Sequence, residues 1–231
     1  MTAHARSFAV PDAPPDIALA SPAAGAGAPT GLYRRGAKRL GDILFVLLFA
    51  PVVVPLVLAM AAITASDGVS PFYSQVRIGR GGRRFRMWKI RTMVADADAA
   101  LAACLAADPD MRAEWTRHQK LRHDPRITRI GRLLRKTSLD ELPQFLNVLL
   151  GDMSVIGPRP MMDGQDKLYP GRSYYALRPG VTGPWQVSDR HASSFADRAR
   201  FDDEYDAGLS LATDARLVVR TVGVILRGTG C

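Results

Sequence analysis

Residues 43–66 read ILFVLLFAPVVVPLVLAMAAITAS and contain no charged side chain. About 20 consecutive apolar residues are needed for a helix to cross the hydrocarbon core of a bilayer, so this segment qualifies as a membrane helix by length. Pro51 and Pro55 interrupt it near the middle. Proline removes a backbone donor and clashes with the preceding helical turn, so a kink near Ala50 is expected.

Basic residues flank this segment on both sides. Those before it are Arg34, Arg35, Lys38 and Arg39, and those after it are Arg77, Arg80, Arg83, Arg84, Arg86, Lys89 and Arg91. Cytoplasmic flanks of membrane helices collect Lys and Arg, so both ends look cytoplasmic. A re-entrant helix that enters one leaflet, bends at Pro51 and returns satisfies both signals. A spanning helix with a tolerated proline kink is the alternative, and spanning helices are the commoner kind.

Composition limits the class of protein and its partners. The 231 residues are 47% hydrophobic, which is enough to bury a real core and suits one domain with small appendages. A net charge of +9 and a pI near 10.1 favour anionic partners such as nucleic acid, acidic lipid headgroups or phosphorylated substrates. Cys104 and Cys231 are too few and too far apart for a disulfide framework or a metal knuckle, which fits a reducing, cytoplasmic-facing location.

The residues before and after the apolar segment predict a tail and a mixed α+β domain. Residues 1–31 are dominated by Ala, Pro, Gly and Ser and are expected to be a disordered tail rather than a signal peptide. Residues 71–91 alternate apolar and polar side chains around Gly79-Arg80-Gly81-Gly82, which predicts a β-hairpin with a tight turn. The glycine spacing fits neither the Walker pattern nor the dinucleotide fingerprint. Residues 94–122 predict two helices broken around Asp108-Pro109.

Two further segments have the pattern of basic amphipathic helices. In residues 126–136, Ile127, Ile130, Leu133 and Leu134 recur at helical spacing among arginines and Lys136. A similar mixture recurs from Asp214 to Arg227. Such helices lie in the plane of a membrane interface, although a solvated charged face on an ordinary helix explains the same pattern.

The candidate catalytic residues lie in Thr137-Ser138-Leu139-Asp140-Glu141-Leu142-Pro143-Gln144, just before an apolar helical stretch. Ser138 and Glu141 have the spacing of a capping box, and two acidic residues at the start of a helix are explained by capping alone. The same geometry also suits chemistry, because a carboxylate beside Arg135 and Lys136 stays ionised and can act as a nucleophile or a metal ligand.

Two later loops can bind parts of a substrate. In Gly157-Pro158-Arg159-Pro160 the prolines fix the backbone, and a rigid loop that presents one guanidinium suits bidentate phosphate contact. A surface loop with a solvated arginine is the alternative. The loop at residues 178–186 joins turn-forming residues to one tryptophan and one glutamine, so it can hold a base or a sugar, or simply turn.

Five blocks in this order make the chain similar to a known family. They are Gln75-Val76-Arg77-Ile78-Gly79, Lys89-Ile90-Arg91-Thr92-Met93, Leu139-Asp140-Glu141-Leu142-Pro143-Gln144, Gly151-Asp152-Met153-Ser154-Val155-Ile156-Gly157-Pro158-Arg159-Pro160 and Arg178-Pro179-Gly180-Val181-Thr182-Gly183. Together they resemble the monotopic phosphoglycosyl transferases, the bacterial sugar transferase family, and the match runs from about Lys38 to Arg227.

The resemblance implies that Asp140 attacks the β-phosphate of a UDP-sugar, which gives a phosphosugar on the enzyme and releases UMP, and that undecaprenyl phosphate then accepts the phosphosugar. It implies Mg²⁺ bound by Asp140 and Glu141, with Glu141 as metal ligand or base. It implies substrate phosphates held by Arg135, Arg159 and Arg190, with Lys89 nearby. It also implies a re-entrant helix broken at a proline, which matches Pro51.

The resemblance places the chain at the cytoplasmic face of the bacterial inner membrane, in the first step of exopolysaccharide assembly. UDP-galactose or UDP-glucose is the expected donor. The predicted fold is α+β and mainly helical, with a disordered tail (1–31), a re-entrant membrane helix (32–67) and a catalytic domain that lies on the membrane (68–231). A nucleic-acid-binding protein and a basic membrane-anchored scaffold are the rival classes, but nucleic-acid binding leaves the uncharged segment unexplained, so no nucleic-acid partner is expected.

Overall fold

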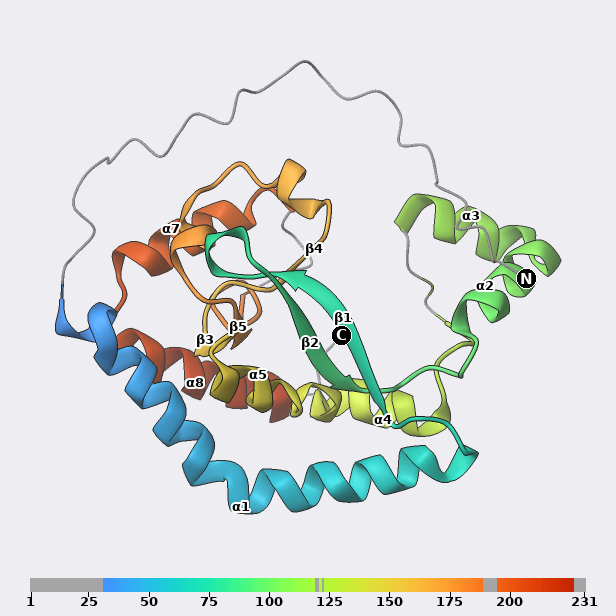
Figure 1. The fold of residues 1–231 in the computed structure, drawn as a ribbon. Helices are drawn as coiled ribbons and strands as arrows, with labels where there is room; N and C mark the ends of the chain where they lie inside the picture. The colour runs from blue at the N-terminus through green and yellow to red at the C-terminus, as the bar shows by residue number, and fades with distance from the viewer. Residues whose placement is uncertain (1–30, 119–120, 122, 189–194, 227–231) are drawn as a thin grey trace.

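The computed structural model describes residues 31–118, 121, 123–188 and 195–226 (Figure 1). The predicted tail therefore lies outside the described residues, apart from Gly31. The α-helices are α1 (Lys38–Thr64), α2 (Ala97–Ala107), α3 (Pro109–His118), α4 (Arg129–Thr137), α5 (Gln144–Leu150), α6 (Ser173–Ala176), α7 (Arg198–Ala207) and α8 (Leu211–Leu226). The strands are β1 (Phe72–Ile78), β2 (Arg84–Ile90), β3 (Ser154–Ile156), β4 (Met161–Met162) and β5 (Gly180–Thr182). The short helical turns are η1 (Tyr33–Ala37), η2 (Ala65–Asp67), η3 (Arg80–Gly82), η4 (Leu139–Glu141) and η5 (Gln165–Leu168).

The first long helix is apolar, bent and largely uncovered. Its helical stretch, Tyr33–Asp67, is long and apolar enough to cross a membrane. Figure 1 shows α1 bending near its middle, and Pro51 and Pro55 both lie inside the helix, so the predicted kink is confirmed. Large apolar side chains along α1 face away from the protein, with Leu48 and Val52 73% and 68% exposed. A continuous apolar surface of this kind is expected where lipid takes the place of water.

Both ends of α1 are bound to the same domain. At the N-terminal end, Arg34 pairs with Asp206 at 2.6 Å, and Lys38 pairs with Asp214 at 2.6 Å. At the C-terminal end, Arg91 donates from one terminal nitrogen to the carbonyl of Thr64 at 3.1 Å. Figure 1 shows the first arm of α1 running down the left of the rest of the protein and the second arm passing below it. The bend therefore lets one helix make polar contacts with the domain at each of its ends.

A buried aspartate fixes the first arm of α1 to β3. The carboxylate of Asp42 accepts the hydroxyl of Ser154 at 2.8 Å and the backbone N–H of Val155 at 3.0 Å. Asp42 and Ser154 are 6% and 1% exposed. A buried charged group persists only when hydrogen bonds and partner charges compensate its lost hydration, and Lys38 lies 4.0 Å from the same carboxylate. The N-terminal arm of α1 is thus held by polar contacts as well as by packing.

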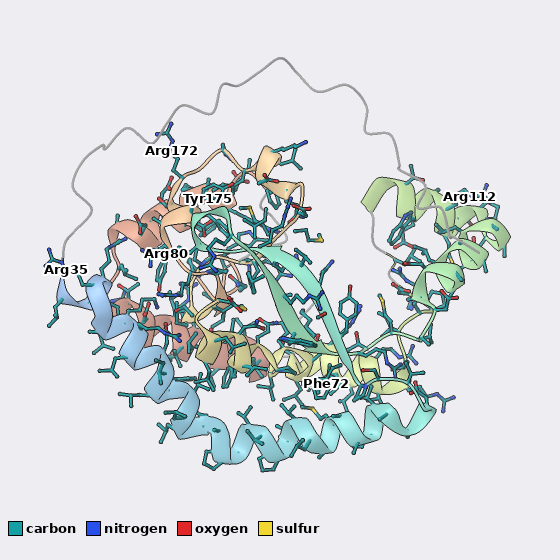
Figure 2. The ribbon with its side chains drawn as sticks, viewed as in Figure 1. Arg35, Phe72, Arg80, Arg112, Arg172 and Tyr175 are labelled. Atoms are coloured by element: carbon teal, nitrogen blue, oxygen red, sulfur yellow. The ribbon has the colours of Figure 1, made fainter. Side chains whose placement is uncertain are left out.

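The predicted hairpin is confirmed. β1 and β2 pair antiparallel from Phe72 opposite Ile90 to Ile78 opposite Arg84, and the chain turns through η3. Gly81 and Gly82 have φ angles of 66° and 78°, which glycine adopts without the penalty of a Cβ. β4 adds a third strand on the free edge of β1. The end of the hairpin that carries Phe72 faces α1 (Figure 2).

Two loops are joined by a close approach of their backbones. β3 and β5 pair in parallel, and the N–H of Gly157 donates to the carbonyl of Thr182 at 2.9 Å. A Cβ on Gly157 would lie 2.3 Å from the carbonyl oxygen of Arg178, and one on Gly180 would lie 2.1 Å from the nitrogen of Gly157. Only glycine fits at these two positions, so the loop that carries Arg159 is fixed against the loop that starts at Arg178.

The core lies between α1, the hairpin, α5 and the β3/β5 pair. Met87 from β2, Val148 from α5 and Met153 before β3 are buried in one cluster with Val46 of α1. Asn147 ties α5 to the hairpin, because its side chain accepts the N–H of Trp88 and donates to the carbonyl of Arg86. This packing places the turn before α5 against the face of the hairpin.

The predicted helices around Asp108-Pro109 are confirmed as α2 and α3, which Figure 1 shows set apart from the rest of the described chain. The amphipathic segments are also helical, but their starts differ from the prediction. Ile127 forms an isolated bridge with Met93, and α4 begins after Thr128, whose hydroxyl accepts the N–H of Gly131. Thr128 is thus the N-cap of α4, whereas the spacing of basic and apolar residues predicted a helix that begins at residue 126. The second segment starts earlier than predicted, at Leu211.

Candidate active site

A cavity of about 820 Å³ lies between the hairpin, the turn before α5, β5 and α8. Five of the residues predicted for the site line it, namely Lys89, Arg135, Asp140, Glu141 and Arg159. They come from β2, α4, η4 and the loop after β3, so segments separated by up to 70 residues of sequence converge on one volume. Arg190, the sixth predicted side chain, lies outside the described residues.

The hairpin contributes one face of β1 to this cavity. Tyr73, Gln75 and Arg77 alternate along β1 and all line the cavity, as strand geometry requires for residues two apart. Lys89 is the direct partner of Tyr73 in the register of the two strands. The strand pairing therefore puts Lys89 on the same face and directs its amine toward the turn that carries the two acidic residues.

The backbone around Asp140 is set by a tight junction between two helices. α4 ends at Thr137, and Ser138 takes a left-handed conformation with φ 56° before η4 begins. The capping box expected from Ser138 and Glu141 is wrong, because the hydroxyl of Ser138 makes no side-chain cap. Glu141 instead reaches Lys89 across the cavity. The left-handed residue reverses the chain abruptly, so the acidic pair turns toward the cavity rather than back toward its own helix.

Asp140, Glu141 and Lys89 form the charged centre of the cavity. The Nζ of Lys89 lies 2.6 Å from Oε1 of Glu141 and 3.9 Å from Oδ2 of Asp140. Asp140 is only 7% exposed, and its burial raises the pKa of its carboxyl to about 6, although the charge of Lys89 opposes this rise and the charge of Glu141 adds to it. At pH 7 the carboxylate is ionised, poorly hydrated and accessible from the cavity, which are the properties of an activated nucleophile.

Cationic side chains surround this centre. Arg135 lines the cavity and is held by a 2.8 Å hydrogen bond from its Nε to the hydroxyl of Thr92. Arg159 lies on the loop fixed by Gly157, and its guanidinium is 5.5 Å from the ring centre of Trp185. Guanidinium groups bind phosphate oxygens through two parallel hydrogen bonds. The cavity is therefore suited to a ligand that carries several phosphate charges.

Apolar side chains also line the cavity. They include Phe45, Phe145, Val218, Val222 and Ile225, from α1, α5 and α8. A second hollow of about 400 Å³ lies between α1, the hairpin and α5, and all of its lining side chains are apolar. They are Val46, Ala50, Val53, Val54, Val57, Leu58, Phe72, Trp88, Leu142, Pro143, Phe145, Leu146 and Leu149. Leu142 and Phe145 line both spaces, so the second hollow, which we call the α1 groove, adjoins the first cavity.

Two neighbouring carboxylates are the candidate metal ligands of the cavity. Asp140 and Glu141 both face the cavity, and hard oxygen ligands of this kind are the ones Mg²⁺ prefers. Within the described residues no group of three His, Cys, Asp or Glu side chains is placed to hold a metal. Two carboxylates match the way in which Mg²⁺ binds together with substrate phosphates, since that ion usually keeps only one or two protein ligands.

Two arginines were given no role from sequence, yet the structure places them beside Arg159. Arg77 lies on the cavity face of β1, and Arg198 begins α7 with its guanidinium 4.2 Å from the ring centre of Trp185. The alternation along β1 could have identified Arg77, because it lies two residues from Gln75 on the face of Lys89. No local pattern marks Arg198, since its position depends on how α7 packs.

Comparison with known proteins, added to this geometry, defines the class. The family model described as bacterial sugar transferase matches residues 33–228 of this chain. The chain therefore belongs to the bacterial sugar transferase family. This membership agrees with the resemblance found in the five sequence blocks, and it favours an enzyme over a scaffold or a nucleic-acid-binding protein.

Several named proteins are similar over most of this chain. One is the "Exopolysaccharide production protein ExoY" of Rhizobium meliloti, 41% identical over 202 residues that cover 87% of this chain and 88% of that protein. Another is a "UDP-galactose-lipid carrier transferase" of Erwinia amylovora, 42% identical over 195 residues that cover 84% of this chain and 41% of that protein. A third is a "UDP-glucose:undecaprenyl-phosphate glucose-1-phosphate transferase" of Caulobacter vibrioides, 36% identical, with 82% of this chain and 69% of that protein covered.

Proposed function

We propose that this chain transfers a sugar 1-phosphate from a UDP-sugar to undecaprenyl phosphate and releases UMP, with Asp140 as the nucleophile. The observation that carries the proposal is a buried carboxylate beside Lys89 and Glu141, in a cavity lined by both cationic and apolar side chains. The names of relatives support the same reaction, and they include UDP-galactose and UDP-glucose as donors. We propose one of these two donors for this chain, in the first step of exopolysaccharide assembly.

The reaction divides into two displacements at one phosphorus atom. In the first, a carboxylate oxygen of Asp140 forms a bond to the phosphorus that carries the sugar, and the bond from that phosphorus to the bridging oxygen breaks, so UMP leaves with the electron pair. In the second, a phosphate oxygen of the lipid attacks the same phosphorus, and the carboxylate of Asp140 departs. The buried carboxylate suits the first displacement because weak hydration leaves its electron pair available.

The surrounding side chains bind and orient the reacting phosphates. Lys89 lies within reach of both carboxylates and offsets the negative charge that gathers near them. Arg135 and Arg159 present guanidinium groups to the same cavity. Asp140 and Glu141 would hold Mg²⁺, which supplies positive charge to the diphosphate and stabilises the leaving group. Glu141 would also accept or return a proton when the lipid phosphate attacks.

The acceptor needs a place for its hydrocarbon chain as well as for its phosphate. The α1 groove offers such a place, because it is lined by apolar side chains and shares Leu142 and Phe145 with the catalytic cavity. An isoprenoid chain in the α1 groove would extend from the membrane helix to Leu142, which follows Asp140 by two residues. The geometry thus supports an acceptor whose phosphate enters the cavity from the membrane side.

The direct test uses the full chain in nanodiscs, with UDP-galactose, UDP-glucose and other UDP-sugars offered in turn together with Mg²⁺ and undecaprenyl phosphate. We expect one donor to yield UMP and a lipid-linked sugar diphosphate in equal amounts, detected by mass spectrometry of the lipid fraction. If no UDP-sugar in the panel gives a lipid product, the proposed reaction is wrong.

We propose that α1 is re-entrant and that the catalytic domain lies on the cytoplasmic face of the inner membrane. Support comes from the bend at Pro51 and from the polar contacts that bind both ends of α1 to one domain. We expect single cysteines at Gly36 and Ser70, both exposed, to be labelled from the cytoplasmic side in a chain whose native cysteines are replaced. Labelling from opposite sides would favour a spanning helix.

We expect Pro51→Ala, which restores the missing N–H, to shift part of the population toward spanning.

The pKa of Asp140 predicts how the first step depends on pH. Since only the ionised carboxylate attacks and its pKa is about 6, UMP release from the donor alone is expected to fall as the pH drops through 6. Between pH 7 and pH 5 the ionised fraction, and with it the rate, decreases about tenfold. Stopped-flow or quench measurements of the UMP burst provide the pH profile. Lys89→Met should move the midpoint of this profile to higher pH, because the charge of Lys89 opposes the rise in the pKa of Asp140. A flat profile would mean that Asp140 does not titrate in this step.

A further inference from the structure

A diphosphate donor presents two phosphate groups, and the charged centre at Asp140 accounts for only one of them. The phosphorus under attack must lie against Asp140, where Lys89 is the cation at 3.9 Å. The phosphate that departs with the nucleotide needs its own cations, because a dianion that loses its hydration shell is strongly destabilised unless positive charges or hydrogen bonds replace it. Three arginines in and beside the cavity wall meet this need, and two of them have no role in the function proposed above.

Arg77 is positioned by hydrogen bonds from both of its terminal nitrogens. One terminal nitrogen donates to Oε1 of Gln75 at 2.6 Å, and the other lies 3.4 Å from the carbonyl of Pro160, in the loop that carries Arg159. Its Nε is buried and has no hydrogen-bond partner within the described residues. A buried guanidinium nitrogen without a partner is rare and calls for an acceptor.

Arg198 reaches the same place from the start of α7. Its guanidinium lies 4.2 Å from the ring centre of Trp185 and 4.4 Å from that of Phe195, so it is held between two aromatic side chains. Its Nε is also buried and has no hydrogen-bond partner in the described part of the chain. Arg159 contacts the same tryptophan at 5.5 Å, so the indole of Trp185 connects two of the three guanidinium groups.

The three positive charges act on one another. Burial lowers the pKa of Arg77, and the charge of Arg159 lowers it further. Burial is the main cause that lowers the pKa of Arg198 to about 10, and the charges of Arg159 and Arg77 lower it as well. The charge of Asp202 opposes this shift. Like charges gathered in a partly buried place destabilise one another, and a bound polyanion removes this cost. The arrangement therefore favours occupation by phosphate.

We propose that Arg77, Arg159 and Arg198 together form a site for the phosphate of the departing nucleotide, which we call the arginine cradle. The identity of the nucleotide rests on the proposed function. The site itself rests on three observations: the Nε atoms of Arg77 and Arg198 have no partner within the described residues, Arg159 and Arg198 both contact the indole of Trp185, and Arg77 and Arg159 line the cavity. The cradle holds the leaving UMP phosphate while Lys89 and Arg135 stay with the phosphosugar on Asp140.

The test compares the binding of UMP and of uridine to the full chain in nanodiscs by calorimetry. We expect Arg198→Ala and Arg77→Gln each to weaken UMP binding by about 10- to 100-fold, the range for loss of a charge-assisted hydrogen bond, and to leave uridine binding unchanged. Arg198→Lys should recover part of the affinity, because an ammonium keeps the charge and lacks the planar fork. Arg200→Ala is the matched control, since Arg200 lies on the same helix with its side chain 67% exposed.

Each outcome decides a separate question. Equal weakening of UMP and uridine in the Arg198 and Arg77 variants, with unchanged thermal unfolding, would contradict the cradle and assign a structural role to these arginines. Unchanged UMP affinity in both variants would also contradict it. If the wild-type chain binds UMP through these arginines but forms no lipid product from any donor, the cradle stands and the proposed transfer fails.

Discussion

Asp140→Asn is expected to abolish the covalent intermediate. Incubation of the wild-type chain with a UDP-sugar and Mg²⁺, without lipid, should release UMP and leave a phosphosugar on the protein. An amide carries no charge and attacks phosphorus poorly, so the variant should show no adduct and a transfer rate lower by more than about 1,000-fold. Intact-protein mass spectrometry measures the adduct, and a coupled UMP assay measures the rate.

The controls separate lost chemistry from lost structure. Burial raises the pKa of Asp140 above its ordinary value, so the ionised carboxylate costs folding stability at pH 7, and Asp140→Asn should unfold no earlier than the wild type. Glu141→Gln should slow transfer and keep the adduct, because the nucleophile is intact. An adduct that persists in Asp140→Asn, or UMP that appears only when donor and lipid are both present, would overturn the covalent mechanism and leave Asp140 as a cap or metal ligand.

Gly157→Ala is expected to cause the second-largest effect, although the residue carries no functional group. The added methyl would lie 2.3 Å from the carbonyl oxygen of Arg178, and backbone on both sides of the contact cannot move without breaking the β3/β5 pairing. Overpacking of this kind costs about 3 kcal/mol or more. We expect lower thermal stability together with a loss of transfer, because the displaced loop carries Arg159.

Gly223→Ala provides the matched control. A Cβ at that position meets nothing within 4 Å, and Ala is favoured over Gly inside a helix such as α8. This variant should therefore keep its activity and be as stable as the wild type or slightly more so. If Gly157→Ala behaves like Gly223→Ala in thermal unfolding and in transfer, the contact between the two loops does not set the position of Arg159.

Sequence patterns were sufficient for the elements whose causes are local. The apolar length, the two prolines, the hairpin alternation around Gly79-Arg80-Gly81-Gly82 and the helix break before Pro109 each depend on neighbouring residues, and the structure has these features. The predicted capping box at Ser138 is wrong, and the reason is also local. The spacing fits a cap, but α4 ends at Thr137, so Ser138 must reverse the chain in a left-handed conformation.

The resemblance to a family located the site residues without explaining how they meet. It pointed to Asp140, Glu141 and Lys89, and the structure places the amine of Lys89 2.6 Å from Glu141 through strand pairing. Arg77 could be reached by extending the same alternation along β1. Arg198 could not, because its partners Trp185 and Arg159 lie on other loops whose relative positions depend on packing.

The sequence by itself determined an apolar helix with a proline bend, a basic chain suited to anionic partners and an acidic pair before α5. These properties follow from charge, from apolar length and from backbone limits that act within a few residues. The tertiary structure decided which charges face one another. Asp42 meets Ser154 across 112 residues, and three arginines from β1, a loop and α7 gather at one side of a cavity. Such contacts arise only when the core packs, because burial and the close approach of Gly157 and Gly180 fix the loops that carry them.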